Sequence, residues 1–355
     1  MKTLNLIKFL FLAGIFFISS CQIEDLDSGK TQSVESNLGV EYIHPPASAK
    51  SYAMGMLSFN DTEEFLETLK ELEELTVSYE DNFMSMWNSL DEDELDKKMD
   101  ELNYDSRQPL IDFQEQFSGF SSLLNMVIEQ EKVFLNNEML DDLNDPDDMY
   151  IYDDELRAVL NNKGQVKIGT SLYQMTRFGY IEITDGDYNT LALVENGDAS
   201  TIDAPNVIIH GAYFGSKEGK NNVNNATNGG CRTWISDEHH YYPTSDRRIK
   251  GKQVLNGYSY IWGSSVKAKT VHYKKIRRKW KRRPGTITAE VRGESKNQYC
   301  AIPSPNNLSK TRNRTEVKVK HSIPSSANFV IHTEYRQLKT VHKRHSTSYT
   351  DYFYE

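Results

Sequence analysis

The charge of this chain is divided sharply between its two halves. Residues 22–160 hold 35 acids and 8 bases, a balance of −27, whereas residues 161–355 hold 16 acids and 31 bases, a balance of +15. Apolar residues recur at helical spacing in the first half, and short β-branched, Tyr-rich runs fill the second. We therefore expect an α+β chain, with a small N-terminal α-helical domain followed by an antiparallel all-β sandwich or flattened barrel.

The acidic α-helical domain is predicted over residues 60–157. Asn60 or Asp61 can cap its first helix, and Leu-rich positions after Phe65 form one face. Further helices are expected over 78–90, from Asp91 through Leu102, over 111–120 and over 122–140. The acidic run 141–148 lacks the glycine and the twelfth-position glutamate of a calcium loop, so a solvated linker is favoured over a calcium site.

From residue 158 the pattern predicts strands separated by Gly, Asn, Pro and Ser. Residues 158–200 are expected to form a β-hairpin connector, with strands over 165–168, 171–175 and 180–184. Residues 201–355 are expected to form the basic all-β domain. Its predicted strands are 206–213, 249–261, 265–275, 285–292, 316–321, 328–339 and 350–354.

The N-terminus is typical of an export signal. Lys2 and Lys8 precede an apolar run over 9–18, which is too short to span a membrane, and Ile18-Ser-Ser-Cys21 resembles a bacterial lipobox. We expect a signal peptide over 1–20, lipidation of Cys21 and a stalk over 21–59, with an ordinary secretory signal as the alternative. The acidic residues after Cys21 resemble the tag that sends Bacteroidota lipoproteins to the outer face of the outer membrane. The periplasmic face is the alternative.

Two cysteines remain once Cys21 carries lipid. In an oxidising compartment, Cys231 and Cys300 are expected to form one disulfide, although two buried free thiols are the alternative. The bridge would close a loop of 70 residues. On the loop-entropy argument it would stabilise the fold by ~4 kcal/mol.

Two segments carry a family resemblance. The segment Phe59–Leu66 with the Leu-rich helix and Trp87, and the glycine-containing hairpin Val159–Tyr173, resemble uncharacterised Bacteroidota outer-membrane or surface lipoproteins. The likeness covers roughly residues 50–200. It implies an envelope location and brings no known catalytic residues.

The strongest local signal is a cationic cluster over residues 274–283. Charge on both faces of a strand excludes a core strand and predicts an exposed hairpin or edge. Arginine forks and an indole suit sulfate, phosphate or carboxylate groups, so the external partners considered are an anionic polysaccharide, lipopolysaccharide and extracellular DNA. The alternative is docking of the basic domain on the acidic one. The candidate residues are Lys274, Lys275, Arg277, Arg278, Lys279, Trp280, Lys281, Arg282 and Arg283.

Asp237-Glu-His-His240 is the most enzyme-like cluster. Adjacent histidines of a strand point to opposite faces, and no H-E-x-x-H motif is present, so we predict no metal site, no cofactor and no catalytic residue. The sequence favours a lipid-anchored cell-surface protein with a non-enzymatic binding role. A structural or accessory envelope protein with internally docked domains is the second hypothesis, and a glycan-acting hydrolase is the third.

Overall fold

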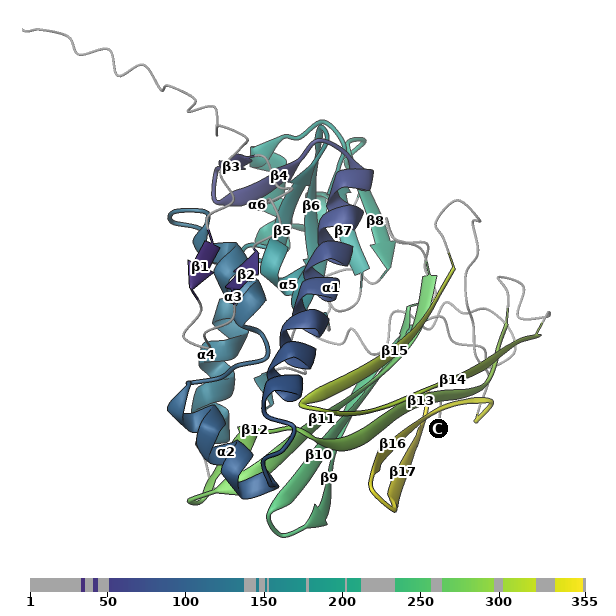
Figure 1. The fold of residues 1–355 in the computed structure, drawn as a ribbon. Helices are drawn as coiled ribbons and strands as arrows, with labels where there is room; N and C mark the ends of the chain where they lie inside the picture. The colour runs from purple at the N-terminus through teal and green to yellow at the C-terminus, as the bar shows by residue number, and fades with distance from the viewer. Residues whose placement is uncertain are drawn as a thin grey trace, which may run out of the picture.

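The chain folds as N-terminal helices followed by antiparallel sheets, which confirms the predicted α+β class (Figure 1). The computed structural model describes residues 33–35, 41–43, 51–136, 145–146, 151, 153–176, 179–201, 203–211, 234–256, 264–296, 303–323 and 336–353. Cys21, Cys231 and Cys300 lie outside these residues, so their lipidation and pairing stay predictions. None of the described helices is long and apolar enough to cross a membrane.

A six-stranded sheet joins the N-terminal segment to the region after the helices. Its order is β3 (Ser51–Ala53), β4 (Met56–Phe59), β5 (Gln165–Ile168), β6 (Ser171–Thr176), β7 (Gly179–Ile183) and β8 (Val207–Gly211). Neighbours are antiparallel except β4 and β5, which run parallel. A separate pair is formed by β1 (Ser33–Glu35) and β2 (Glu41–Ile43).

The predicted stalk over 21–59 is wrong at its C-terminal end. Met56, Leu57 and Phe59 are buried in β4. Their side chains enter the hydrophobic cores on both sides of the six-stranded sheet, because alternate residues of a strand face opposite ways.

Six helices are described. They are α1 (Thr62–Met86), α2 (Glu92–Glu101), α3 (Gln108–Glu115), α4 (Leu123–Leu135), α5 (Asp154–Val159) and α6 (Tyr188–Glu195). Asp61 caps α1, Asp91 and Glu94 form a capping box on α2, and Ser122 caps α4. The prediction of a separate helix over 78–90 is wrong: α1 runs through Ser78, since no Gly or Pro interrupts it.

The helices and the six-stranded sheet share one hydrophobic core. Phe65 and Leu72 of α1 and Leu124 of α4 pack in the same cluster as Val166 and Tyr173 of the sheet. Ranges 60–157 and 158–200 thus contribute side chains to a single interior.

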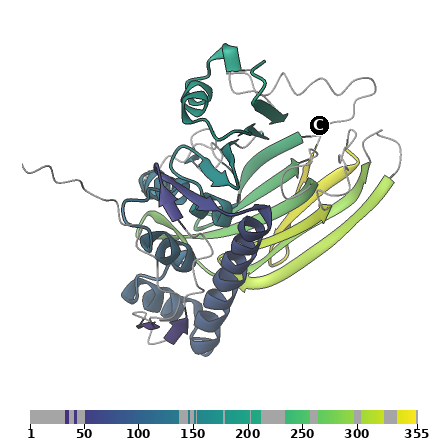
Figure 2. The same ribbon diagram turned by 90° about the horizontal axis from the view of Figure 1, so that it is seen from above.

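The C-terminal half is a sandwich of two antiparallel sheets, as predicted. One contains β9 (Trp234–Thr244), β10 (Arg247–Asn256), β11 (Ser264–Ile276), β12 (Lys279–Arg282) and β15 (Glu316–Ile323). The other contains β13 (Gly285–Lys296), β14 (Pro303–Arg314), β16 (Leu338–Arg344) and β17 (Thr347–Tyr352). Between them lies an apolar core that includes Ile249, Val266, Ile287 and Val317. Seen from above, the helices lie on one side of this sandwich (Figure 2).

Several strands depart from the prediction. β9 and β14 are strands where the sequence predicts none, because charged and polar residues interrupt their alternation. β12 lies in the cationic segment predicted as a hairpin or edge. The predicted strand over 328–339 lies mostly outside the described residues, and β16 begins only at Leu338.

Candidate functional site

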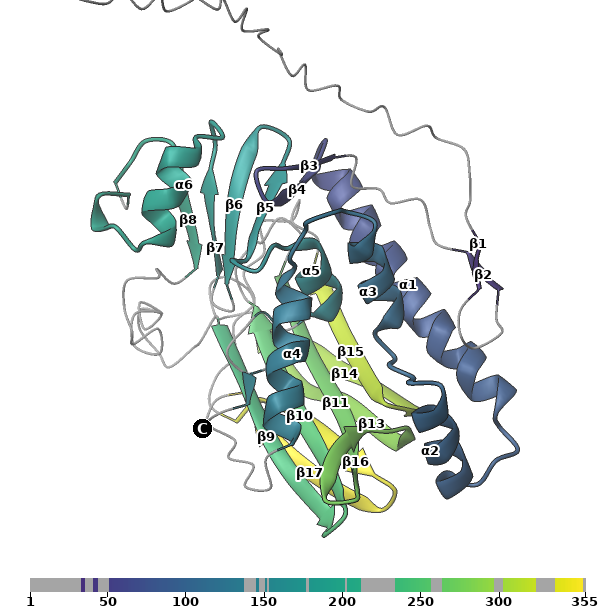
Figure 3. The ribbon, with the colours of Figure 1, turned by 90° about the vertical axis from the view of Figure 1, so that its left-hand side faces the viewer.

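The helices cover the outer face of the five-stranded sheet, and this face is charged (Figure 3). Along β10, Ile249 and Leu255 point into the sandwich core, whereas Arg248, Lys250 and Lys252 occupy the alternate positions and are buried. Carboxylates from the helices and from the segment before α5 meet this face. The pairs include Lys318–Glu155, Lys267–Asp153, Lys269–Asp154, Lys250–Asp145 and Arg247–Glu92. At the end of β14 in the other sheet, Arg314 pairs with Asp81 of α1.

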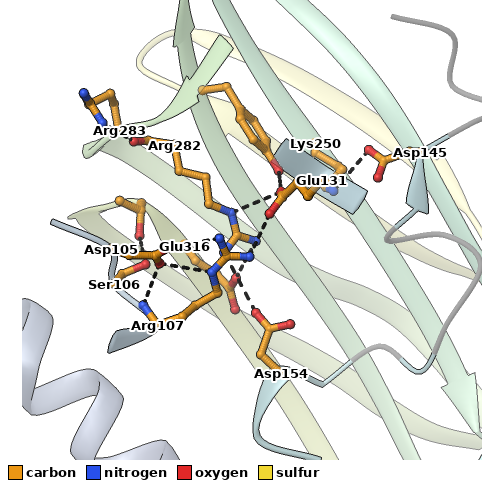
Figure 4. A network of polar contacts seen from close by, with 12 residues as sticks. Asp105, Ser106, Arg107, Glu131, Asp145, Asp154, Lys250, Arg282, Arg283 and Glu316 are labelled. Carbon is orange, nitrogen blue, oxygen red and sulfur yellow. Dashed lines mark hydrogen bonds and ion pairs between the residues drawn. The ribbon is translucent and has the colours of Figure 1, made fainter. Parts of the chain in front are cut away.

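Glu131 of α4 lies at the centre of this ionic layer (Figure 4). Its carboxylate accepts a hydrogen bond from Arg107 Nη1 at 2.7 Å and another from the Tyr273 hydroxyl at 3.0 Å. The Nε of Arg282 lies 3.5 Å from the same group. Burial alone would raise the pKa of Asp105, but Arg107 beside it lowers that pKa to about 2. Asp105 is therefore charged at neutral pH.

The predicted cationic cluster lies on the β11–β12 hairpin, which confirms the expected hairpin at a sheet edge. Arg277 and Arg278 form its turn with φ of 49° and 68°. Two consecutive residues with positive φ are typical of a tight hairpin turn of the primed kind. Arg277, Arg278 and Lys279 are exposed, whereas Trp280 is only 6% exposed and packs with Leu135 of α4.

Much of the cluster contacts the acidic helices. Lys274 Nζ lies 2.5 Å from Asp96 and 2.9 Å from Asp93 of α2. Lys281 lies 2.7 Å from Asp100. Arg283 pairs with Asp96 and Asp100, and Arg282 with Glu131. Lys275 stacks over the Trp280 ring at 5.7 Å.

A cavity of about 450 Å³ lies between the β12 side of this hairpin and helices α2 and α4. Its walls include Tyr104, Arg107, Glu131, Trp280, Arg282 and Arg283. The Tyr104 hydroxyl on the wall finds no hydrogen-bond acceptor among the described residues. The Nε atoms of Arg282 and Arg283 lie 3.5 and 3.1 Å from carboxylates of Glu131 and Asp96, but neither makes a well-aligned hydrogen bond. A buried donor without an acceptor costs about 1–3 kcal/mol, so the cavity suits a ligand that supplies oxygen acceptors.

A second polar cluster brings Asp145 together with Glu238 and His240. The predicted solvated linker is wrong for Asp145, which is 1% exposed and lies 3.0 Å from His240 Nε2 and 3.2 Å from Lys250 Nζ. Burial lowers the pKa of His240, but hydrogen bonds with Asp145 and Glu238 outweigh it and raise that pKa. His239 faces the other side, near Asp351, as the alternation predicts.

Three ligand atoms of this second cluster lie within 4.8 Å of one another, a spacing that a metal ion could use. Lys252 Nζ, however, lies 2.7 Å from Glu238, and Lys250 lies beside Asp145. The two ammonium groups already balance the two carboxylates, so the donor set suits an internal ion-pair network better than a divalent cation.

Sequence reasoning identified the cationic hairpin and did not identify its partners Arg107, Glu131 and Tyr104. The alternation Arg248-x-Lys250-x-Lys252 was a usable signal, because it places cations on a single face of one strand. It would have predicted a charged sheet face that needs an acidic cover.

No protein-family model and no curated protein matches this sequence. Among solved structures, the fold is similar to a DUF4848 family protein from Bacteroides thetaiotaomicron. The identity is 11%, the TM-score is 0.20, and the likeness covers 83% of this chain and 95% of the other.

Proposed function

We propose that this chain is an exported, lipid-anchored envelope protein that binds a small acidic ligand without catalysis. The ligand class is a sugar acid, such as a uronate unit at the end of an anionic glycan. The site is the 450 Å³ cavity between the β11–β12 hairpin, α2 and α4. Anchoring through Cys21 and exposure on the cell exterior are parts of the same proposal, supported by the N-terminal pattern.

The observation that carries the proposal is a set of donors on the cavity wall that make no well-aligned hydrogen bond with the described residues. The Tyr104 hydroxyl has no acceptor, and the Nε atoms of Arg282 and Arg283 face carboxylates only as ion-pair partners. A carboxylate can accept from an arginine fork, and sugar hydroxyls can accept from the tyrosine. Trp280 and Tyr104 add aromatic surface of the kind that sugar rings contact, and the volume lies within the range of small-molecule sites.

A compact ligand fits better than a long polyanion lying along the hairpin. Lys274, Lys281 and Arg283 are already paired with carboxylates of α2. A polyanion would have to displace these intramolecular partners, leaving mainly the exposed Arg277 and Arg278 to contact it.

The test uses the mature chain with Cys21→Ser, so that the protein stays in solution. Glucuronate and uronate oligosaccharides are titrated by calorimetry, with glucose as the uncharged control. Tyr104→Phe removes only the hydroxyl that lacks an acceptor, so it should not lower the melting temperature of the unliganded protein and should weaken binding about tenfold.

Arg277→Gln with Arg278→Gln is the matched control, because it removes two charges outside the cavity. The proposal predicts unchanged uronate binding in this variant. If Arg277→Gln with Arg278→Gln abolishes binding and Tyr104→Phe does not, the ligand lies on the hairpin surface and the cavity proposal is wrong.

A second candidate is a structural role in which the charges serve assembly of the chain. It is favoured by the ion pairs that join the helices to the basic sheet. Absence of uronate binding, together with ordinary envelope localisation, would support this candidate over the first.

A further inference from the structure

A second cavity, of about 280 Å³, lies where α1 and α5 meet β11 and β15. It is lined by other residues than the proposed sugar-acid site. One part of its wall is apolar, formed by Leu66 and Leu69 of α1, Leu156 of α5 and Val319 of β15. The remaining wall carries charged side chains.

The charges on this wall do not balance locally. Lys267 pairs with Asp153, and Lys318 lies 2.6 Å from Glu155. Lys320 makes no hydrogen bond or ion pair with the described residues, and it lines the same cavity. One cation therefore faces the cavity without a carboxylate of its own.

Lys320 also lies directly opposite a second lysine. In the antiparallel pairing of β11 with β15, Lys267 and Lys320 are register partners. Directly opposed side chains of neighbouring strands have Cβ atoms about 5 Å apart, and like charges there are destabilising. Repulsion from Lys267, followed by burial, lowers the pKa of Lys320 to about 8.

We propose that this cavity binds a monocarboxylate with a short apolar body. The carboxylate lies between the ammonium groups of Lys320 and Lys267, and the apolar body packs against Leu66, Leu69 and Leu156. One negative charge relieves the repulsion between the two lysines, because it interacts favourably with both.

The wall chemistry selects this class over other anions. Asp153, Glu155 and Glu73 also line the cavity, so a phosphate dianion would meet three nearby carboxylates. A neutral apolar molecule would leave the lysine repulsion in place. A free inorganic anion would leave the leucines uncovered.

The test titrates hexanoate into the mature chain carrying Cys21→Ser and follows binding by calorimetry. Hexanamide and acetate are the matched probes, since each lacks either the charge or the apolar body. Hexanoate should bind at least tenfold more tightly than both. Equal binding of hexanamide would overturn the role of the lysine pair.

Two variants separate the site from general charge effects. Lys320→Gln should abolish hexanoate binding, whereas Lys97→Gln should not change it, because Lys97 is an exposed lysine of α2 that pairs with Glu101 outside this cavity. Lys320 makes no ion pair with the described residues and repels Lys267, so neither substitution should lower the melting temperature. Retained binding in Lys320→Gln would overturn the proposal.

A spectroscopic readout tests the same geometry independently. With lysines carrying ¹³C-methyl labels, hexanoate should raise the pKa of Lys320 by about one unit or more, because a bound carboxylate favours the charged amine. The corresponding signal of Lys97, which lies outside the cavity, should not shift. An unchanged Lys320 titration in the presence of saturating hexanoate would contradict the assigned contact.

Discussion

The two faces of the five-stranded sheet are built from the same strands and meet opposite kinds of partner. On the inner face, Ile249 and Val266 pack into an apolar core with the second sheet. On the outer face, Lys250 and Lys269 are equally buried but meet carboxylates from the acidic part of the chain. Alternation along a strand decides which residues share a face, and the composition of the covering layer decides whether a buried cation is tolerated.

The space between the two sheets also contains histidines, His272 of β11 and His342 of β16, which stay neutral there. Burial lowers the pKa of His342 to about 3 and that of His272 to about 4. His272 Nδ1 donates to the carbonyl of Arg283, and its Nε2 accepts from Arg344 Nε. These two imidazoles are thus uncharged, whereas the lysines of the outer face are paired with carboxylates.

The largest expected effect comes from removing an acid at the centre of the ionic layer. Glu131→Ala should destabilise the fold by about 3–5 kcal/mol, because Arg107 and Arg282 would stay buried without their shared carboxylate. Chemical denaturation measures the loss. Glu129→Ala, on the exposed side of the same helix, is the control and should change stability by less than about 0.5 kcal/mol.

A second test concerns a buried acid, Glu80, whose charge the ionic layer does not compensate. Glu80 is buried and accepts hydrogen bonds from the amide and hydroxyl of Thr315, at 2.7 and 2.8 Å. Burial raises its pKa to about 7, and these hydrogen bonds only partly oppose the shift. The folded state therefore favours the protonated acid, and its contribution to stability is lost as pH rises from about 4.5 to 7.

Glu80→Gln should accordingly stabilise the protein at pH 8 by about 3 kcal/mol and have little effect at pH 4. The measurement is the free energy of unfolding of both proteins across this pH range. A constant difference between the two proteins at every pH would show that Glu80 is already ionised in the fold.

On the inner face of the five-stranded sheet, stability should be sensitive to added side-chain volume rather than to the loss of a charge. A Cβ at Gly251 would lie 2.5 Å from the ring of His342, a fully buried side chain. Gly251→Ala should therefore cost about 1–3 kcal/mol through overpacking. In a double-mutant cycle with His342→Ala, the alanine at 251 should cost much less, and simple additivity would contradict the steric explanation.

The smallest effect is expected at the rim of the ionic layer. Lys281 and Asp100 form a 2.7 Å pair that remains partly exposed. Lys281→Gln should change stability by less than about 1 kcal/mol, and added salt should reduce the difference further. A loss as large as that of Glu131→Ala would mean that burial does not distinguish the two positions.

The fold class, the helix caps and the sandwich follow from local patterns. Asp91 and Glu94 have capping-box spacing, and Val317 and Val319 of β15 alternate with lysines. The burial of Asp145 could not be predicted, because its partners His240 and Lys250 lie about a hundred residues away in the chain. The local sequence shows that the segment is polar, but only its tertiary contacts decide whether its polar side chains face solvent or are buried.

The cavity that we propose as the binding site shows the same limit. Lys274–Arg283 stands out in the sequence because its charges are consecutive. Tyr104 and Arg107 come from the connection between α2 and α3 and reach the cavity only through the packing of these helices and α4 against β12. The sequence shows where charged residues are concentrated. Which of them form ion pairs depends on which helix covers which strand.

The parallel pairing of β4 with β5 has a mechanical consequence. Ser58 and Phe59 are register partners of Lys167 and Ile168, directly before α1 begins. Tension arriving from the N-terminal side would pass the β1–β2 pair and β3 and then load this short ladder in shear. The sandwich follows the six-stranded sheet in the chain. It would bear less of this force and stay folded while β4 detaches from β5.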